Sequence, residues 1–158
     1  MKRVHVHIGV KNLEEAIRFY SGLFNSEPVK TKPGYAKWLL DDPAINLAVS
    51  TQSSKQGIDH LGIQVDDSQE LKDLRARLEH AEMSTFDEGE AVCCYARSDK
   101  TWVQDPAEVP WEVYRTMEDA EVFSCNVQEG EEACCTPQAA AQSSCTEGST
   151  VDENCCAA

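Results

Sequence analysis

A short internal repeat constrains the fold of this chain more than any other feature of its sequence. The segments HVHIGVKN and HLGIQVDD start at His5 and His60 and end at Asn12 and Asp67. In each segment apolar residues alternate as in a strand, and the last residue is a common N-cap of a helix. Two copies of one supersecondary unit are expected to pack against each other, so we predict a fold built from two similar halves.

The patterns that follow the two copies are also alike, with one amphipathic helix and then several short strands. In the first half we predict a strand at 3–10, a helix at 13–24 and strands near 27–31, 35–41 and 44–50. In the second half we predict a strand at 60–65, a helix after 66–67 and strands near 84–88, 91–98, 101–104 and 111–115. The first half therefore reads β-α-β-β-β. The second half reads the same once its four short stretches after the helix are taken as three strands with uncertain boundaries.

These patterns predict an α+β domain at 1–118, made of two tandem βαβββ modules at about 1–52 and 57–118. From 119 to 158 the sequence is acidic, contains no Lys or Arg and has few large apolar residues, which is typical of a flexible tail. Six of the eight cysteines lie there: Cys125, Cys134, Cys135, Cys145, Cys155 and Cys156. Three roles stay open for them: delivery of a thiophilic species to the domain, a third thiolate for that species, and no function.

The overall charge and the start of the chain limit the classes of partner. The formal net charge of −14 argues against nucleic acid, whose phosphates would be repelled. No segment approaches the roughly 20 apolar residues that cross a bilayer, and the first residues read as a strand rather than a signal peptide. We therefore predict a cytoplasmic protein without membrane contact, in which cysteines serve metal binding or catalysis rather than a disulfide framework. The oligomeric state, including a homodimer, stays open.

Three residues are candidate metal ligands. His5 and His60 occupy equivalent places in the repeat, on the strand face opposite the aliphatic residues, and Glu112 lies between aromatic and aliphatic neighbours in the last predicted strand. Two histidines and one carboxylate form the facial triad of non-haem Fe(II) oxygenases, which leaves coordination positions open. His7 points to the same side as His5 and is the alternative first ligand, although the repeat favours His5. Read singly, each residue could also be an ordinary structural polar side chain.

The adjacent pair Cys93-Cys94 is the second candidate site. Thiolates prefer soft, thiophilic centres, and a trivalent arsenical with two exchangeable hydroxyls could bind both sulfur atoms. Adjacent side chains of a strand point to opposite faces, so joint binding of one atom needs a bulge, a turn or rotated side chains. The alternative is one buried structural cysteine beside an exposed one.

Longer motifs resemble a known superfamily. The stretches VHVHIGV at 4–10 and LEEAIRFYSGLF at 13–24 resemble the opening of the glyoxalase/bleomycin-resistance/extradiol-dioxygenase superfamily, whose members have the vicinal oxygen chelate fold. The stretches CCYARSDKTWVQDP at 93–106 and WEVY at 111–114 resemble, more narrowly, organoarsenical carbon–arsenic lyases and their cadmium-induced relatives. One difference is the turn DPAEVP from 105 onward, where this family usually has Asp-Gly after Asp-Pro.

The resemblance, which covers about residues 3–116, implies a function for both sites. It implies Fe(II) held by His5, His60 and Glu112, and arsenic held by Cys93 and Cys94. The implied reaction is O2-dependent cleavage of the carbon–arsenic bond of trivalent organoarsenicals, such as methylarsenite and aryl arsenites, to inorganic arsenite. The alternative is a non-catalytic protein that sequesters Cd(II) or As(III) through its thiols. The preferred organic group, and iron against Zn, Ni or Co as native metal, stay open.

Overall fold

The computed structural model describes residues 2–121, so nearly all of the tail predicted at 119–158 lies outside the described residues. The elements are β1 (Arg3–Gly9), α1 (Leu13–Phe24), β2 (Lys30–Lys32), β3 (Tyr35–Asp41), β4 (Ala44–Ser50), β5 (Gly57–Val65), α2 (Ser68–His80), β6 (Thr85–Cys93), β7 (Ala96–Gln104) and β8 (Pro110–Asp119). The predicted order β-α-β-β-β thus occurs twice, as module 1 (β1 to β4) and module 2 (β5 to β8). In this part of the chain, no helix has the length and apolar character needed to span a membrane.

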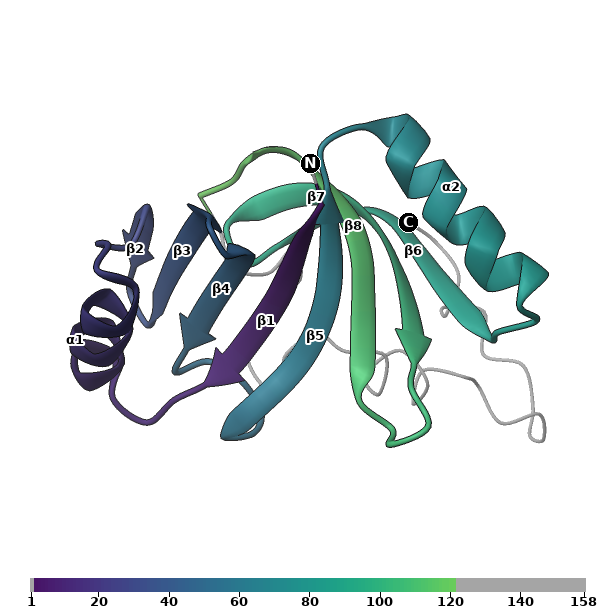
Figure 1. Cartoon of the computed structure of the whole chain (residues 1–158). Helices are drawn as coiled ribbons and strands as arrows, with labels where there is room; N and C mark the ends of the chain where they lie inside the picture. The colour runs from purple at the N-terminus through teal and green to yellow at the C-terminus, as the bar shows by residue number, and fades with distance from the viewer. Residues whose placement is uncertain (1, 122–158) are drawn as a thin grey trace, which may run out of the picture.

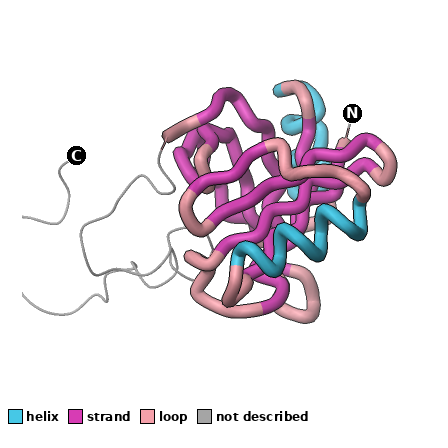
Figure 2. Tube along the Cα trace, turned by 90° about the vertical axis from the view of Figure 1, so that its left-hand side faces the viewer, coloured by secondary structure: helices cyan, strands magenta, loops and turns pink. Residues whose placement is uncertain are grey.

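All eight strands form one curved sheet, in the order β2-β3-β4-β1-β5-β8-β7-β6. The first strands of the two modules, β1 and β5, are antiparallel neighbours at its centre. Each also pairs in parallel with the last strand of its own module, β4 or β8. The two modules therefore meet along one seam, between β1 and β5, and the sheet curves as a half-barrel around it with the helices outside (Figure 1, Figure 2).

Each helix covers the outer face of its own module with a small hydrophobic core. In module 1, Ala16 of α1 packs with the fully buried Trp38, and Val6 of β1 joins them. In module 2, Leu71 of α2 packs with Val65 of β5. Because side chains alternate along a strand, this arrangement directs the polar residues of β1 and β5 to the inner, concave face.

The helices start at the two capping residues that the repeat aligned. The Asn12 side chain accepts a hydrogen bond from the backbone N–H of Glu15 at 3.1 Å, and Asp67 accepts one from that of Glu70 at 2.8 Å. Each satisfies an N–H group that the first turn leaves without a partner inside the helix. Helix α1 ends at Phe24 and is capped by Asn25, whose φ of 49° lies in the left-handed region. The prediction of a helix at 13–24 is confirmed.

One strand prediction is wrong, and the error falls on the adjacent cysteines. The pattern predicted a strand across 91–98, whereas β6 ends at Cys93 and β7 begins at Ala96. Cys94 and Tyr95 form a two-residue hairpin turn, with φ values of 55° and 61°. Such turns usually contain Gly or Asn, since other residues are strained at positive φ. This turn contains neither Gly nor Asn, so the alternation of apolar and polar residues continues through it. The sequence therefore predicted three short strands where the structure has two long ones, β6 and β7.

The loop between β7 and β8 keeps its shape without the expected glycine. One carboxylate oxygen of Asp105 accepts hydrogen bonds from the backbone N–H groups of Ala107 at 2.8 Å and Val109 at 2.9 Å. Glu108 takes the positive φ, 62°, that a glycine would adopt more easily. The departure from the family turn therefore leaves Glu112 within β8.

Candidate metal and thiol site

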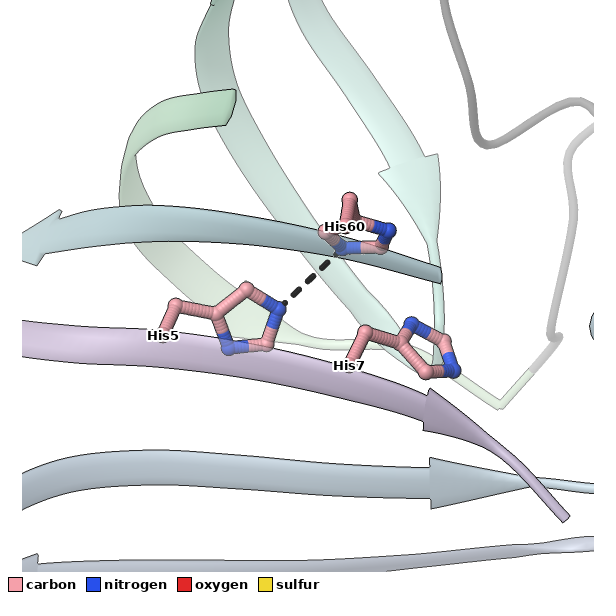
Figure 3. A group of neighbouring side chains, drawn as sticks. All are labelled: His5, His7 and His60. Carbon is pink, nitrogen blue, oxygen red and sulfur yellow. Dashed lines mark hydrogen bonds between the residues drawn. The ribbon is translucent and has the colours of Figure 1, made fainter. Parts of the chain in front are cut away.

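The three predicted metal ligands come from neighbouring strands at the seam. His5 lies in β1, His60 in β5, and Glu112 in β8, where it pairs with Gly62 of β5. Their side chains are buried on the concave face. His5 Nε2 lies 3.2 Å from His60 Nε2 (Figure 3), and Glu112 Oε2 lies 3.8 Å from the first nitrogen and 3.9 Å from the second. Adjacent ligands on a metal with bonds of ~2.1 Å are roughly 3 Å apart, so the structure brings these residues together at nearly that spacing.

Hydrogen bonds at the Nδ1 atoms orient both imidazole rings. His5 Nδ1 donates to the backbone carbonyl oxygen of Asn46 at 3.0 Å, and His60 Nδ1 lies 2.7 Å from a carboxylate oxygen of Asp59. Both acceptors lack a hydrogen, so Nδ1 of each ring carries a proton. In the neutral form of a ring held in this way, Nε2 has the free lone pair, which is the tautomer and the outer support that metal-bound histidines commonly have.

The ionisation of these groups also suits a cation. Burial, with the nearby charge of His60, lowers the pKa of His5 to about 4, so the ring is neutral at physiological pH. Burial alone would raise the pKa of Glu112, but the charges of Lys100, His60 and His5 outweigh it and lower this pKa to about 2. Lys100 Nζ donates to Glu112 Oε1 at 2.8 Å, which leaves Oε2 toward the histidines.

These contacts test whether the donor set fits a metal. Two nitrogen lone pairs and an ionised oxygen point at one region, where they repel one another unless something positive lies between them. Two imidazoles and one carboxylate are a donor set suited to Fe(II), with positions left open for reactants. The residues present therefore fit a divalent cation.

His7, the alternative first ligand, lies beside this set. Its ring centroid is 4.8 Å from that of His60 and 6.4 Å from that of His5 (Figure 3). One donor atom from each of these three histidines lies within 4.8 Å of the others. The atoms of His5, His60 and Glu112 are closer together, at 3.2–3.9 Å, and we therefore favour them as the ligands. Burial, with the charges of His60 and His5, lowers the pKa of His7 to about 3.

The hairpin turn between β6 and β7 brings the two cysteines together. Their sulfur atoms are 3.2 Å apart, farther than the roughly 2.05 Å of a disulfide bond between them. Cys93 and Cys94 line the same cavity as His5, His60 and Glu112. In a regular strand the two adjacent side chains would point to opposite faces, and the turn is what allows both sulfur atoms to reach one bound atom. Burial, partly offset by the charge of Lys100, raises the pKa of Cys94 to about 12, so this sulfur carries its proton at neutral pH.

Module 1 holds this turn of module 2 in place through Tyr95. The backbone carbonyl oxygen of Tyr95 accepts a hydrogen bond from Lys30 Nζ at 3.0 Å, and its hydroxyl donates to the carbonyl oxygen of Pro33 at 3.3 Å. Its ring also lies 5.4 Å from the ring of Tyr35, centroid to centroid. These contacts from β2, β3 and the segment between them offset the strain of the positive φ values.

Four supporting residues were missed from the sequence: Asn46, Asp59, Tyr95 and Lys100. A signal existed for Asp59, because a carboxylate directly before a ligand candidate is a plausible partner for its ring. Asn46 and Lys100 carry no such signal, since their contacts to His5 and Glu112 depend on strand register.

The sequence and the fold are similar to those of known proteins. The sequence matches the Glyoxalase/Bleomycin resistance protein/Dioxygenase superfamily over residues 2–113. It is 36% identical to a protein from Thermomonospora curvata named trivalent organoarsenical cleaving enzyme, over 99% of this chain and 100% of that one. It is 42% identical to cadmium-induced protein CadI from Mycobacterium bovis, over 78% of this chain and 82% of that one. The fold resembles that of homoprotocatechuate 2,3-dioxygenase from Arthrobacter globiformis, with a TM-score of 0.54 and 17% identity, over 77% of this chain and 38% of that one.

Proposed function

Because the chain belongs to the glyoxalase/bleomycin resistance protein/dioxygenase superfamily, we propose that it is an enzyme whose cavity unites a metal with a thiophilic substrate. The reaction is cleavage of the carbon–arsenic bond of trivalent organoarsenicals, the substrate class in the name of its relative from Thermomonospora curvata. One observation carries the proposal: Cys93 and Cys94 line the same cavity as His5, His60 and Glu112. A substrate held by the sulfur atoms would therefore lie beside the metal ligands.

The two cysteines bind the arsenic. The exchange requires both cysteines as thiols. A trivalent organoarsenical, R–As(OH)2, then exchanges both hydroxyls for sulfur, forms two As–S bonds and releases two molecules of water, with no net change in protons. The raised pKa of Cys94 suits this exchange, because a buried thiol needs no counter-charge. Once the first As–S bond has formed, the second is intramolecular and benefits from a high effective concentration.

His5, His60 and Glu112 hold the divalent metal, which we propose to be Fe(II). When bound, this ion supplies the redox chemistry that consumes O2, and the three protein ligands leave positions for reactants. Lys100 holds one oxygen of Glu112 and keeps the other toward the histidines. Asn46 and Asp59 keep the two rings in one tautomer. Fixing both reactants in one cavity can itself lower the barrier by several kcal/mol, up to about 7–11 in the best intramolecular cases.

The test is turnover by the purified full-length protein. With Fe(II), O2 and methylarsenite, we expect inorganic arsenite in amounts well above one equivalent per chain. The same mixture without O2 should release none. Stoichiometric loss of free methylarsenite without arsenite, equal with and without O2, would instead identify a sequestering protein. Phenylarsenite in a parallel assay shows which organic group is preferred.

A further inference from the structure

One buried histidine, His7, is left out of the proposed ligand set. It is 2% exposed and lines the cavity on the same face of β1 as His5. Its Nε2 lies 3.4 Å from Ser53 Oγ, while its Nδ1 has no hydrogen-bond partner among residues 2–121. Buried polar atoms nearly always have a partner, so this nitrogen points to something that the cavity binds.

The geometry around His7 indicates what that partner is. One donor atom each of His5, His7 and His60 lies within 4.8 Å of the others, and Glu112 Oε2 lies within 3.9 Å of the first and third. Figure 3 shows the three rings gathered from two adjacent strands. In a tetrahedral site with bonds of ~2.0 Å the donors are about 3.3 Å apart. A movement of His7 by up to about 1.5 Å would therefore complete a four-donor set.

We propose that His7 Nδ1 is a fourth, exchangeable metal donor, which closes the site around a four-coordinate cation such as Zn(II). This inference rests on the proposed ligands His5, His60 and Glu112, but not on carbon–arsenic cleavage. Ser53 Oγ is placed to accept the Nε2–H of His7 and so to keep Nδ1 deprotonated, as outer partners of metal-bound histidines do.

The consequence is selection among metals by coordination number. Zn(II) has no geometric preference from its d electrons and is satisfied by four protein donors, after which no position remains for a reactant. A cation that favours six ligands takes the three closer donors and keeps open positions. With His7 as fourth donor, Zn(II) is a tight-binding inhibitor. Fe(II) at the same site keeps coordination positions open for reactants.

The test observes the ring nitrogens of the histidines directly. Binding of Zn(II) to the cysteines therefore does not affect the interpretation. The full-length chain has four histidines, and uniform 15N labelling with long-range proton–nitrogen NMR reports each ring nitrogen. With Zn(II) as the probe, we expect Nε2 of His5 and His60 and Nδ1 of His7 to shift to metal-bound values. If only His5 and His60 respond, the inference is overturned. If none of the three responds, both it and the proposed ligand set are wrong.

Substitution adds a second measurement. His7→Ala, and the bulkier His7→Gln in case the first variant is unstable, should weaken Zn(II) binding at the NMR-defined site by at least about tenfold, because loss of an outer partner of a ligand alone costs roughly 10–100-fold. Fe(II) affinity should change by less than about threefold. The matched control is His80→Ala, which removes an exposed histidine at the end of α2. Equal losses of Zn(II) and Fe(II) affinity in the His7 variants would show a structural role only and overturn the inference.

Discussion

The two modules share a fold but differ on the face that meets the other module. Alignment of His5 with His60 also aligns His7 with Gly62. In the sheet, His7 pairs with Ala48 of β4, whereas Gly62 pairs with Glu112 of β8. Module 2 therefore contributes two of the proposed ligands, where module 1 contributes one and has alanine at the equivalent of Glu112.

Their hairpins differ as well. In module 1 strand β2 has three residues, whereas β6 and β7 of module 2 have nine each. The longer hairpin carries the cysteine turn to module 1, where Lys30 and Pro33 hold Tyr95. The outer cores of the two modules thus keep the repeat, whereas their concave faces differ, so that neither module holds all of the proposed ligands. The missing counterpart of Glu112 is also what leaves the proposed metal partly open.

The largest expected effect comes from removing the proposed ligands of module 2. Glu112→Ala gives β8 the residue that β4 has at Ala48, and His60→Ala removes the only feature of the site that the two modules share, the ring that matches His5. Each variant should reduce arsenite release to background and lose bound Fe(II), because one of three ligands is gone. Metal content and turnover are measured together, with Glu118→Ala, an exposed acid of the same strand, as control. Retention of Fe(II) and activity by Glu112→Ala would contradict the ligand assignment.

The second prediction concerns the hairpin that distinguishes module 2. Cys93→Ser and Cys94→Ser should each nearly eliminate carbon–arsenic cleavage, because one sulfur cannot chelate arsenic. Both variants should keep bound Fe(II) and stay folded, since serine is close to cysteine in size. Arsenite release and bound arsenic are compared with those of Cys145→Ser. A sequestering protein would lose only a fraction of its arsenic capacity in all three variants, and full cleavage by either of the first two would exclude the two-sulfur mechanism.

The third prediction concerns the buried histidines of module 1. The folded pKa of His5, about 4, and that of His7, about 3, lie below the unfolded value of 6.5. A lowered pKa means that the stabilisation is present above pH 6.5 and is lost as pH falls toward the folded pKa. The metal-free protein should thus lose free energy of unfolding from pH 6.5 downward, eventually on the order of 3 kcal/mol for His5 alone. Urea titrations of the metal-free protein at pH 7.5, 6.5 and 5.5 measure this free energy of unfolding.

The exposed His80 provides the control for this pH dependence, because His80→Ala should leave the slope unchanged. A free energy of unfolding that stays constant between pH 6.5 and 5.5 would contradict the burial argument for module 1.

The smallest effect is expected from filling the space at Gly62, the residue of β5 that aligns with His7 of β1 in the repeat. A Cβ at Gly62 would lie 2.3 Å from the backbone oxygen of Glu112 and would push β8 away. Gly62→Ala should therefore cost about 1–3 kcal/mol of stability and weaken Fe(II) binding. A Cβ at Gly22 in α1 meets no described atom within 4 Å beyond its own helix and chain neighbours. Gly22→Ala should instead stabilise the protein by about 0.5–1 kcal/mol. Similar effects of the two substitutions in thermal unfolding would contradict the close approach.

The features that could be predicted from the sequence were those that depend on neighbours along the chain. The helix at 13–24 follows from the cap at Asn12 and from apolar spacing, and the βαβββ order follows from the repeat. His5 and His60 were candidates because equivalent strands of two packed copies must lie together. The cysteine turn could not be predicted, because its positive φ values are held by contacts from β2, β3 and the segment between them. For the same reason Lys100 was missed, since its ion pair with Glu112 arises only in the folded sheet.

The position of the proposed ligands across the seam also links metal occupancy to the cohesion of the whole domain. His5 belongs to one module and His60 and Glu112 to the other. A cation bound by all three would therefore hold the two modules together, and neither module could bind it in the same way alone. By mass action, a free metal concentration one hundred times the dissociation constant adds about 2.7 kcal/mol to the free energy of unfolding. A chelator would withdraw the same amount. With Fe(II) as the proposed cation, iron supply would thereby affect the lifetime of the protein against proteolysis as well as its activity.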